Sequence, residues 1–129
     1  MTELYDTCVF IDYWRGDPGA ASLINEVRKN PRSAYYSTLS VTELWQYPGL
    51  DRREEIEYTA LVRFFLTECS LGTAEAMKAG QWLRPLNRSQ RMKLAADALI
   101  AATADSGGHT IRTRNIRDLT KFYSNTQTY

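Results

Sequence analysis

The sequence is poor in the residues that build sulfur- or imidazole-based staples and metal sites. Its 129 residues include two cysteines, Cys8 and Cys69, and a single histidine, His109. The cysteines lie inside apolar runs without CxxC spacing, which argues against a zinc site and favours free thiols in a reducing cytoplasm. A chain of this length can bury one hydrophobic core without disulfide or metal staples.

Long apolar runs and an excess of charge of either sign are also missing. No segment approaches the roughly 20 apolar residues of a membrane span, and the first residues do not form a basic stretch followed by an apolar signal segment. We therefore expect a soluble, cytoplasmic protein with no membrane association. Because the net charge is +1, overall charge does not by itself indicate a nucleic-acid partner.

Short segments rich in β-formers alternate with helical patterns along the whole chain. Strands separated by helices form parallel sheets that are covered on both faces. The sequence therefore predicts an α/β fold: a single domain over residues 1–129, with a parallel sheet of four to five strands and helices on both faces. Strands are expected to end at Tyr5 and to span 34–38 and 109–113, and helices to begin at Thr7, Pro18, Ser40 and Asn115 and to span 51–68, 73–83 and 89–105.

Helix starts can be predicted from capping residues. Ser40-Val41-Thr42-Glu43 has the capping-box pattern, so Ser40 is expected as the N-cap and Glu43 as its partner. Ser89 is expected to cap a later helix. The helix over 51–68 is expected to turn an apolar stripe that includes Ile56 toward the core.

Asp97 lies in the most apolar stretch of the chain, residues 94–104. A helix that is apolar nearly all round is normally buried, and an ionised aspartate there costs several kcal/mol unless a cation or hydrogen-bond donors compensate it. The alternative is a structural aspartate that caps the helix or pairs with Arg91 or Lys93. Since a cap belongs at a helix end, the position favours a functional role.

Asp6 and Glu43 are expected at one sheet edge. Asp6 stands where the first strand stops, followed by the hydroxyl of Thr7, and Glu43 lies in the helix after the second strand. Ligands of open parallel sheets bind at the carboxyl ends of the strands. Three carboxylates gathered there, with Asp97, would repel one another unless a divalent cation lay between them. Such clusters select hard ions, Mg²⁺ or Mn²⁺, and a metal-bound water at such a site hydrolyses phosphodiesters.

An aspartate after a first strand is also typical of phospho-accepting receivers and of dehalogenase-type phosphatases. The phosphatases need a second aspartate two residues on, where this sequence has Cys8. A receiver needs an acidic pair and a lysine after a late strand, where this sequence has Thr113-Arg114-Asn115. Both alternatives fit the sequence poorly.

Short motifs lie at residues 6–12, Asp-Thr-Cys-Val-Phe-Ile-Asp, at residues 40–44 and at residues 97–104. In this order and at this spacing they resemble the opening, second and third motifs of PIN-domain proteins of the VapC toxin type. Residues 113–119, Thr-Arg-Asn-Ile-Arg-Asp-Leu, are similar to the fourth, with leucine replacing phenylalanine. Each motif alone is unspecific, whereas the ordered set over residues 4–122 is a strong resemblance.

The resemblance implies a metal-dependent endoribonuclease with a five-stranded parallel sheet. Family members usually form homodimers and are held inactive by a small antitoxin encoded beside them, and many cleave transfer or ribosomal RNA at one place. The implied partners are therefore an RNA substrate, a cognate antitoxin and a second copy of the chain. The implied catalytic residues are Asp6, Glu43, Asp97 and Asp118, the first three as metal ligands, with Thr7 and Asn115 in support.

The spacing leaves open which residue completes the acidic site. Asn115 follows the strand 109–113 directly, and Asp118 lies one helical turn further on. Asp118 could instead form a salt bridge with Arg114 or Lys121. We expect Asp118 to act on the metal through water and Asn115 to position a water molecule.

Several charged residues near these motifs have structural as well as functional readings. Arg112, Arg114 and Arg117 could bind RNA phosphates, line an antitoxin groove or face solvent. Asp12 is expected to cap or pair locally, for example with Arg15, and the single histidine to make a local hydrogen bond.

A rival reading from another functional class is a PIN-fold binding module that has lost catalysis and acts only through protein partners. Intact Asp6, Glu43 and Asp97 argue against it, because a non-catalytic fold has no reason to retain clustered charge.

Overall fold

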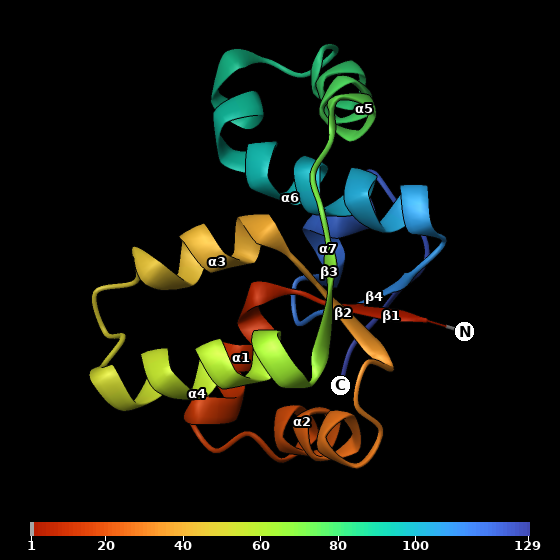
Figure 1. Ribbon diagram of the computed structural model, residues 1–129. Helices are drawn as coiled ribbons and strands as arrows, with labels where there is room; N and C mark the ends of the chain where they lie inside the picture. The colour runs from red at the N-terminus through yellow and green to blue at the C-terminus, as the bar shows by residue number, and fades with distance from the viewer. Residues whose placement is uncertain (1) are drawn as a thin grey trace.

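A five-stranded parallel sheet forms the centre of the molecule. The computed structural model describes residues 2–129, and its strands follow the order β3-β2-β1-β4-β5 (Figure 1). The α/β fold and the parallel sheet predicted from the alternating pattern are confirmed. The strands are β1 (Glu3–Tyr5), β2 (Ala34–Ser37), β3 (Leu66–Cys69), β4 (Thr110–Arg112) and β5 (Thr126–Gln127).

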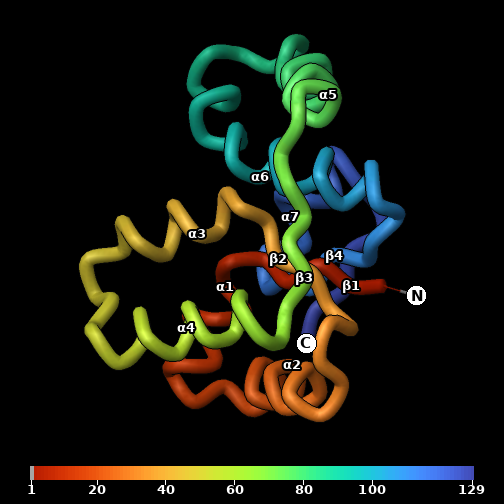
Figure 2. Tube along the Cα trace, viewed as in Figure 1, coloured from red at the N-terminus to blue at the C-terminus, as the bar shows by residue number. Residues whose placement is uncertain are grey.

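Helices cover both faces of this sheet. In Figures 1 and 2 the helices α1, α2 and α4 lie on one side of the strands, and α5, α6 and α7 on the other. Within residues 2–129, no helix is long and apolar enough to cross a membrane. The helices are α1 (Thr7–Trp14), α2 (Pro18–Lys29), α3 (Thr38–Trp45), α4 (Arg52–Phe64), α5 (Thr73–Leu83), α6 (Arg88–Gly107) and α7 (Ile116–Leu119).

The central strand β1 supplies one residue to each side of the core. Successive strand residues point to opposite faces, so Tyr5 packs with the α1, α2 and α4 layer while Leu4 packs with α6 and α7. On the first face Phe10 lies edge-on to Tyr58, with ring centroids 4.9 Å apart. This buried pair joins α1 to α4 and so fixes the position of α1, which begins directly after Asp6.

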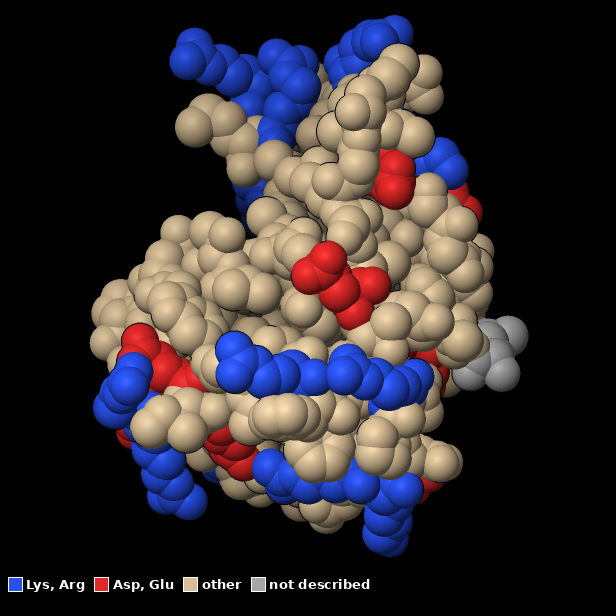
Figure 3. Space-filling model, in the orientation of Figure 1, with Lys and Arg blue, Asp and Glu red and all other residues tan. Residues whose placement is uncertain are grey.

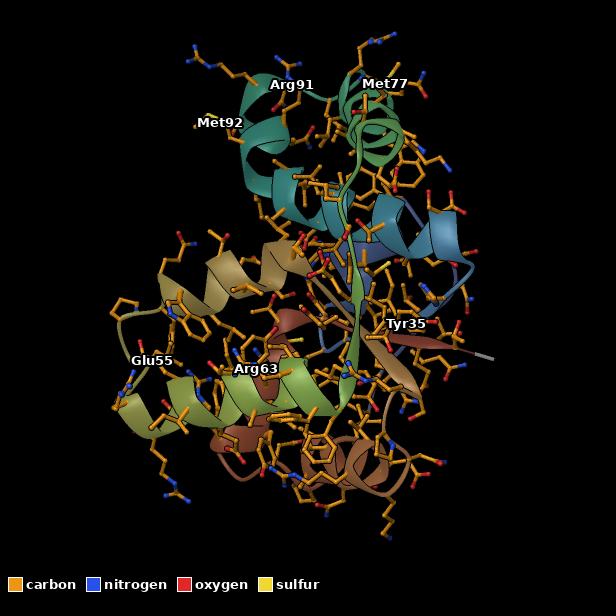
Figure 4. The ribbon with its side chains drawn as sticks, in the orientation of Figure 1. Tyr35, Glu55, Arg63, Met77, Arg91 and Met92 are labelled. Carbon is orange, nitrogen blue, oxygen red and sulfur yellow. The ribbon has the colours of Figure 1, made fainter. Side chains whose placement is uncertain are left out.

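Helix α6 lies close to the opposite face because its inner side is built of small residues. Ala101 and Ala104 are fully buried with Ile100, Ile111 of β4 and Leu119 of α7. Small side chains let a helix approach its neighbours closely. Figure 4 shows Arg91 and Met92 projecting outward at the end of α6 that lies away from the sheet. Lys and Arg side chains gather over that end of the molecule (Figure 3).

The predicted helix over 51–68 is too long. Helix α4 ends at Phe64, and Leu66–Cys69 forms β3, which pairs in parallel with β2 through Ala34↔Leu66. The strand has four residues and is stabilised by pairing with a distant segment, so local periodicity could not reveal it. Within α4 the expected core residue Ile56 is 57% exposed, while Leu61 is buried.

Two predicted N-caps are also wrong. Helix α3 is capped by Ser37, whose side chain accepts a hydrogen bond from the amide of Leu39, so Ser40 lies inside the helix. Helix α6 is capped by Asn87 rather than Ser89. Both observed caps precede the expected ones in sequence. Asn and Ser are about equally favourable as N-caps, so residue type alone does not decide which of two nearby candidates begins the helix.

Tyr58 offers a test of the core on the α1–α4 side. Its ring is fully buried, yet within residues 2–129 its hydroxyl has no hydrogen-bond partner. Because a buried unsatisfied hydroxyl is costly, Tyr58→Phe should raise the free energy of unfolding by about 1 kcal/mol in urea denaturation. Tyr5→Phe is the matched control: its buried hydroxyl donates to the carbonyl of Leu23 at 3.2 Å, so this change should lower stability. Equal effects of the two changes would contradict the prediction.

Candidate active site

Asp6 lies where β1 ends and α1 begins. Its Oδ1 caps α1 by accepting a hydrogen bond from the Thr7 amide at 2.8 Å. Its Oδ2 accepts from the Thr113 hydroxyl at 2.8 Å, directly after β4. The side chain is 7% exposed and all of these donors are neutral groups. The carboxylate is therefore fixed in orientation by donors that do not neutralise it.

Glu43 reaches the same place from α3. The Thr7 hydroxyl donates to its Oε1 at 2.7 Å and lies 2.9 Å from the hydroxyl of Ser40. The expectation that Glu43 closes a capping box with Ser40 is wrong, because α3 already begins at Thr38. A residue this far into the helix cannot cap its first turn. Thr7 instead joins the start of α1 to α3.

Asp97 comes from the middle of α6. It is half-buried, and the amide nitrogen of the Asn115 side chain donates to its Oδ1 at 3.5 Å. The backbone amide of Asn115 in turn donates to the Thr113 hydroxyl at 2.9 Å. The loop between β4 and α7 thus contacts both Asp6 and Asp97.

These three carboxylates open onto one cavity of about 430 Å³. Sequence reasoning did not assign Cys8 or Ile11 to the site, although both follow Asp6 within two helical turns. A helical periodicity counted from Thr7 could have found Ile11, four residues on, whereas Cys8 carries no such signal. The lining consists of the three acids and the side chains of Thr7, Cys8, Ile11, Arg114 and Asn115.

Burial raises the pKa of all three acids, and neighbouring carboxylates add to the rise at Asp97 and Glu43. Burial, followed by the charges of Asp6, Asp118 and Glu43, raises the pKa of Asp97 to about 6. Burial also raises the pKa of Asp6 and that of Glu43, although hydrogen bonds from Thr113 and Thr7 oppose the two shifts. Arg114 is the only cation among the lining residues and faces three acids, so the cavity carries net negative charge.

A second cavity, of about 350 Å³ between α1 and α4, provides a contrast. Asp51, Glu54 and Glu57 line it. Glu57 accepts hydrogen bonds from Trp14 at 2.8 Å and Tyr13 at 3.0 Å and pairs with Arg28 at 2.7 Å. Burial opposes these contacts, but together they lower the pKa of Glu57. Glu57 is paired with a cation, and Asp51 and Glu54 bind each other's backbone amides as the capping box of α4. The acids of this cavity are therefore engaged in structural contacts, unlike those of the first.

The donor set of the first cavity fits a hard divalent cation. All of its acidic donors are carboxylate oxygens, and their mutual repulsion would be relieved by positive charge. Within residues 2–129, no three acidic, imidazole or thiol groups already converge closely enough to enclose an ion. Mg²⁺ does not require such a cage, since it usually binds one or two carboxylates directly and retains several waters. The open volume leaves room for those waters.

Asp118 lies beside this cavity rather than in its lining. Its charge contributes to the raised pKa of Asp97, while its Oδ1 lies 3.4 Å from the ammonium of Lys121. Asn115 does line the cavity. The expected salt bridge of Asp118 with Lys121 is present, and its role at a metal stays a prediction.

The three C-terminal arginines differ in place. Arg114 lines the cavity, whereas Arg112 is partly buried and pairs with Glu3 at 2.7 Å across β1 and β4. Arg117 is exposed on α7. Geometry therefore favours Arg114 over the other two as a ligand of a bound phosphate.

Two pairings that the sequence predicts to be local are made with distant residues instead. Asp12 does not pair with Arg15; it pairs with Arg114 and accepts a hydrogen bond from the hydroxyl of Tyr129. This partner set is distant in sequence and had no local signal. His109 does make a hydrogen bond, its Nδ1 lying 2.6 Å from the Thr2 hydroxyl, but this partner is also distant in sequence. His109 lies outside the lining of the cavity.

Comparison with known proteins places the chain in a family. A family model described as the PIN domain matches residues 4–122. The chain belongs to the PIN-domain family. Two relatives from different strains of Mycobacterium tuberculosis, both named Ribonuclease VapC19, are each 31% identical over 122 residues, which cover 93% of this chain and 94% of theirs.

Solved structures of this fold include toxin–antitoxin complexes. DNA-bound VapBC from Salmonella typhimurium superposes with a TM-score of 0.72 at 17% identity, covering 99% of this chain and 98% of that one. VapBC2 from Rickettsia felis, bound to a DNA fragment from the promoter, gives a TM-score of 0.71 at 14% identity and covers 100% and 99%. At these identities the likeness shows the PIN fold.

The raised pKa of Asp97 makes a prediction about stability. Its value in the folded protein, about 6, lies above the ordinary 3.8, so the metal-free protein should lose stability as the pH rises from about 4 to 6. In Asp97→Asn the free energy of unfolding should therefore fall less over this pH range. It should also raise the free energy of unfolding at pH 7 by about 1 kcal/mol, allowing for screening at a half-exposed side chain.

The measurement is urea denaturation in a chelator at several pH values. Asp105→Asn, on the same helix, is the control, because its carboxylate pairs with Lys78 at 2.8 Å and its loss should bring no gain in stability. Finding Asp97→Asn no more stable than wild type at pH 7 would remove the case for charge repulsion in the cavity.

Proposed function

We propose that this protein is a metal-dependent endoribonuclease and the toxin of a toxin–antitoxin pair. The observation that carries the proposal is the convergence of Asp6, Glu43 and Asp97 on one open cavity with uncompensated negative charge. Carboxylate sites of this kind serve phosphodiester hydrolysis. The relatives named ribonucleases, which match nearly the whole chain, support RNA as the substrate.

The residues of the cavity have distinct roles in this proposal. Asp6, Glu43 and Asp97 hold Mg²⁺, with Mn²⁺ as an alternative ion, and the ion when bound acidifies a water and offsets charge on the scissile phosphate. Thr113 orients Asp6, and Thr7 orients Glu43, through the hydrogen bonds described above. Asn115 holds a water beside Asp97, and Arg114 binds a phosphate at the rim.

The proposed partners are proteins as well as RNA. The solved neighbours are complexes of a VapC-type toxin with its antitoxin, so we propose a small antitoxin, encoded beside this gene, that holds the protein inactive. We also propose a homodimer. Of the aromatic residues on α4, Tyr58 is fully buried in the core, whereas Phe64 is 59% exposed and available for contact with a second copy.

A PIN-fold binding module without catalysis is the remaining alternative. Such a module would gain nothing from carboxylates whose repulsion costs folding free energy. Replacing Asp97 by a neutral residue would be an easy route to stability, yet the acid is present. The cluster therefore favours an enzyme.

The first test of function is RNA cleavage. Asp6→Asn and Asp97→Asn should each abolish cleavage of a pool of transfer and ribosomal RNA while the proteins stay folded, because each removes a charged metal ligand. Chelation by EDTA should abolish wild-type cleavage, and added Mg²⁺ or Mn²⁺ should restore it. Gel analysis of the RNA gives the readout, with Asp105→Asn as the folded, active control. Undiminished cleavage by highly purified Asp97→Asn would defeat the assignment of the site.

The roles of Asp118 and Asn115 can be separated by metal titration. Asp118 lies outside the lining and acts on the metal through water in our proposal, so Asp118→Ala should weaken cleavage at low Mg²⁺ and be partly rescued at high Mg²⁺. Lys121→Ala is the control, since it breaks the Asp118 salt bridge but keeps the acid. If Asp118→Ala cleaves normally at every Mg²⁺ concentration while Asn115→Ala does not, the two roles must be exchanged.

A further inference from the structure

Asp12 lies on the same helix as Asp6 but is not part of the acidic cavity. Its side chain is almost fully buried near the end of α1, where both carboxylate oxygens have partners. Oδ1 pairs with a guanidinium nitrogen of Arg114, and Oδ2 accepts a hydrogen bond from the Tyr129 hydroxyl at 2.6 Å. Asp12 thus links the last residue described to an arginine that lines the cavity.

Tyr129 is itself seated in the fold. Its ring packs against the core cluster on the α1 and α2 side. Its backbone lies so close to Gly19, in the first turn of α2, that a Cβ at residue 19 would be 2.6 Å from the Tyr129 carbonyl carbon. The packing at Gly19 fixes the tyrosine independently of its hydroxyl.

Arg114 needs such a restraint because of where it lies. Its side chain is 58% exposed and borders a cavity lined by three carboxylates, whose charge would draw a free guanidinium inward onto the metal-binding oxygens. Within residues 2–129, the only hydrogen bond given by its guanidinium goes to Asp12 through Nη1. The remaining N–H groups are therefore free at the rim, in the planar arrangement that suits a phosphate.

We propose that Asp12 and Tyr129 are positioning residues that hold the Arg114 guanidinium at the rim of the cavity, where it binds a backbone phosphate of the substrate. The inference rests on the proposed ribonuclease function. Tyr129 donates a neutral hydrogen bond to one oxygen of Asp12, which fixes the carboxylate and leaves its charge for Arg114. The arginine is thereby kept both off the metal site and within reach of the RNA.

The test is a double-mutant cycle on RNA cleavage. Tyr129→Phe removes one hydroxyl and, with it, the hydrogen bond to Asp12. It should raise the apparent KM about fivefold with little change in kcat, because the loss of one hydrogen bond weakens the positioning of Arg114. Arg114→Ala should raise KM by tenfold or more and reduce the slope of log(kcat/KM) against log[salt] by about 0.7. The double variant should be no worse than Arg114→Ala alone.

Three further variants make the test specific. Tyr47→Phe is the matched control, because it removes a tyrosine hydroxyl that accepts from Arg15 outside the cavity, and it should leave KM unchanged. Gly19→Ala should reproduce the Tyr129→Phe effect, since its methyl group displaces the Tyr129 backbone. Cys8 is also close to Tyr129, and in a Cys8→Ala background the effect of Tyr129→Phe should persist.

The outcomes separate this inference from the proposed function. Wild-type protein that cleaves no RNA with any divalent metal would overturn the proposed function and, with it, the inference. Active wild type with an unchanged KM in Tyr129→Phe would overturn the inference alone. The inference would also be overturned if Tyr129→Phe raised KM as much in the Arg114→Ala background as in wild type. The same holds if the effect of Tyr129→Phe on KM disappeared only in the Cys8→Ala background.

Discussion

Three carboxylates of like charge share one cavity, and holding them together costs free energy that the rest of the fold must offset. The hydrogen-bond donors around these carboxylates are neutral groups. Thr7, Thr113 and Asn115 supply neutral hydrogen bonds that fix the orientation of the acids without neutralising them. The core on both faces of the sheet supplies the stability, and the charge remains available to an external cation.

The strand order explains why the site forms at this edge. β1 is central, with β2 on one side and β4 on the other, and ligands bind where the direction of strand connection reverses. Asp6 after β1 and Thr113 after β4 face each other across that point and are joined by a hydrogen bond. Asp97 arrives differently, from mid-helix, and its position depends on how closely the alanines of α6 approach the sheet.

What the sequence could predict follows from how local each feature is. The α/β class and the position of Asp6 depend on a short strand followed by a helix, and both can be recognised from neighbouring residues. Strand β3 depends on pairing with β2, and four residues after a helix carry no periodic signal of their own. The sequence predicts Glu43 at the site, but it also predicts a capping box between Glu43 and Ser40, which is wrong. The actual partner of Glu43, the hydroxyl of Thr7, lies on another element.

The least predictable feature is the partner set of Asp12, and it separates two acids that look alike in the motif. Asp6 and Asp12 both lie at α1, both are buried, and each has two occupied oxygens. Asp6 accepts hydrogen bonds from neutral donors and has no ion-pair partner within residues 2–129, so its charge remains available to a cation, although Arg114 lies near enough to oppose the rise in its pKa. Asp12 is paired with a guanidinium, so its charge is compensated within the fold. Because burial is the same, the charge of the donors decides which acid can serve a metal and which positions another side chain.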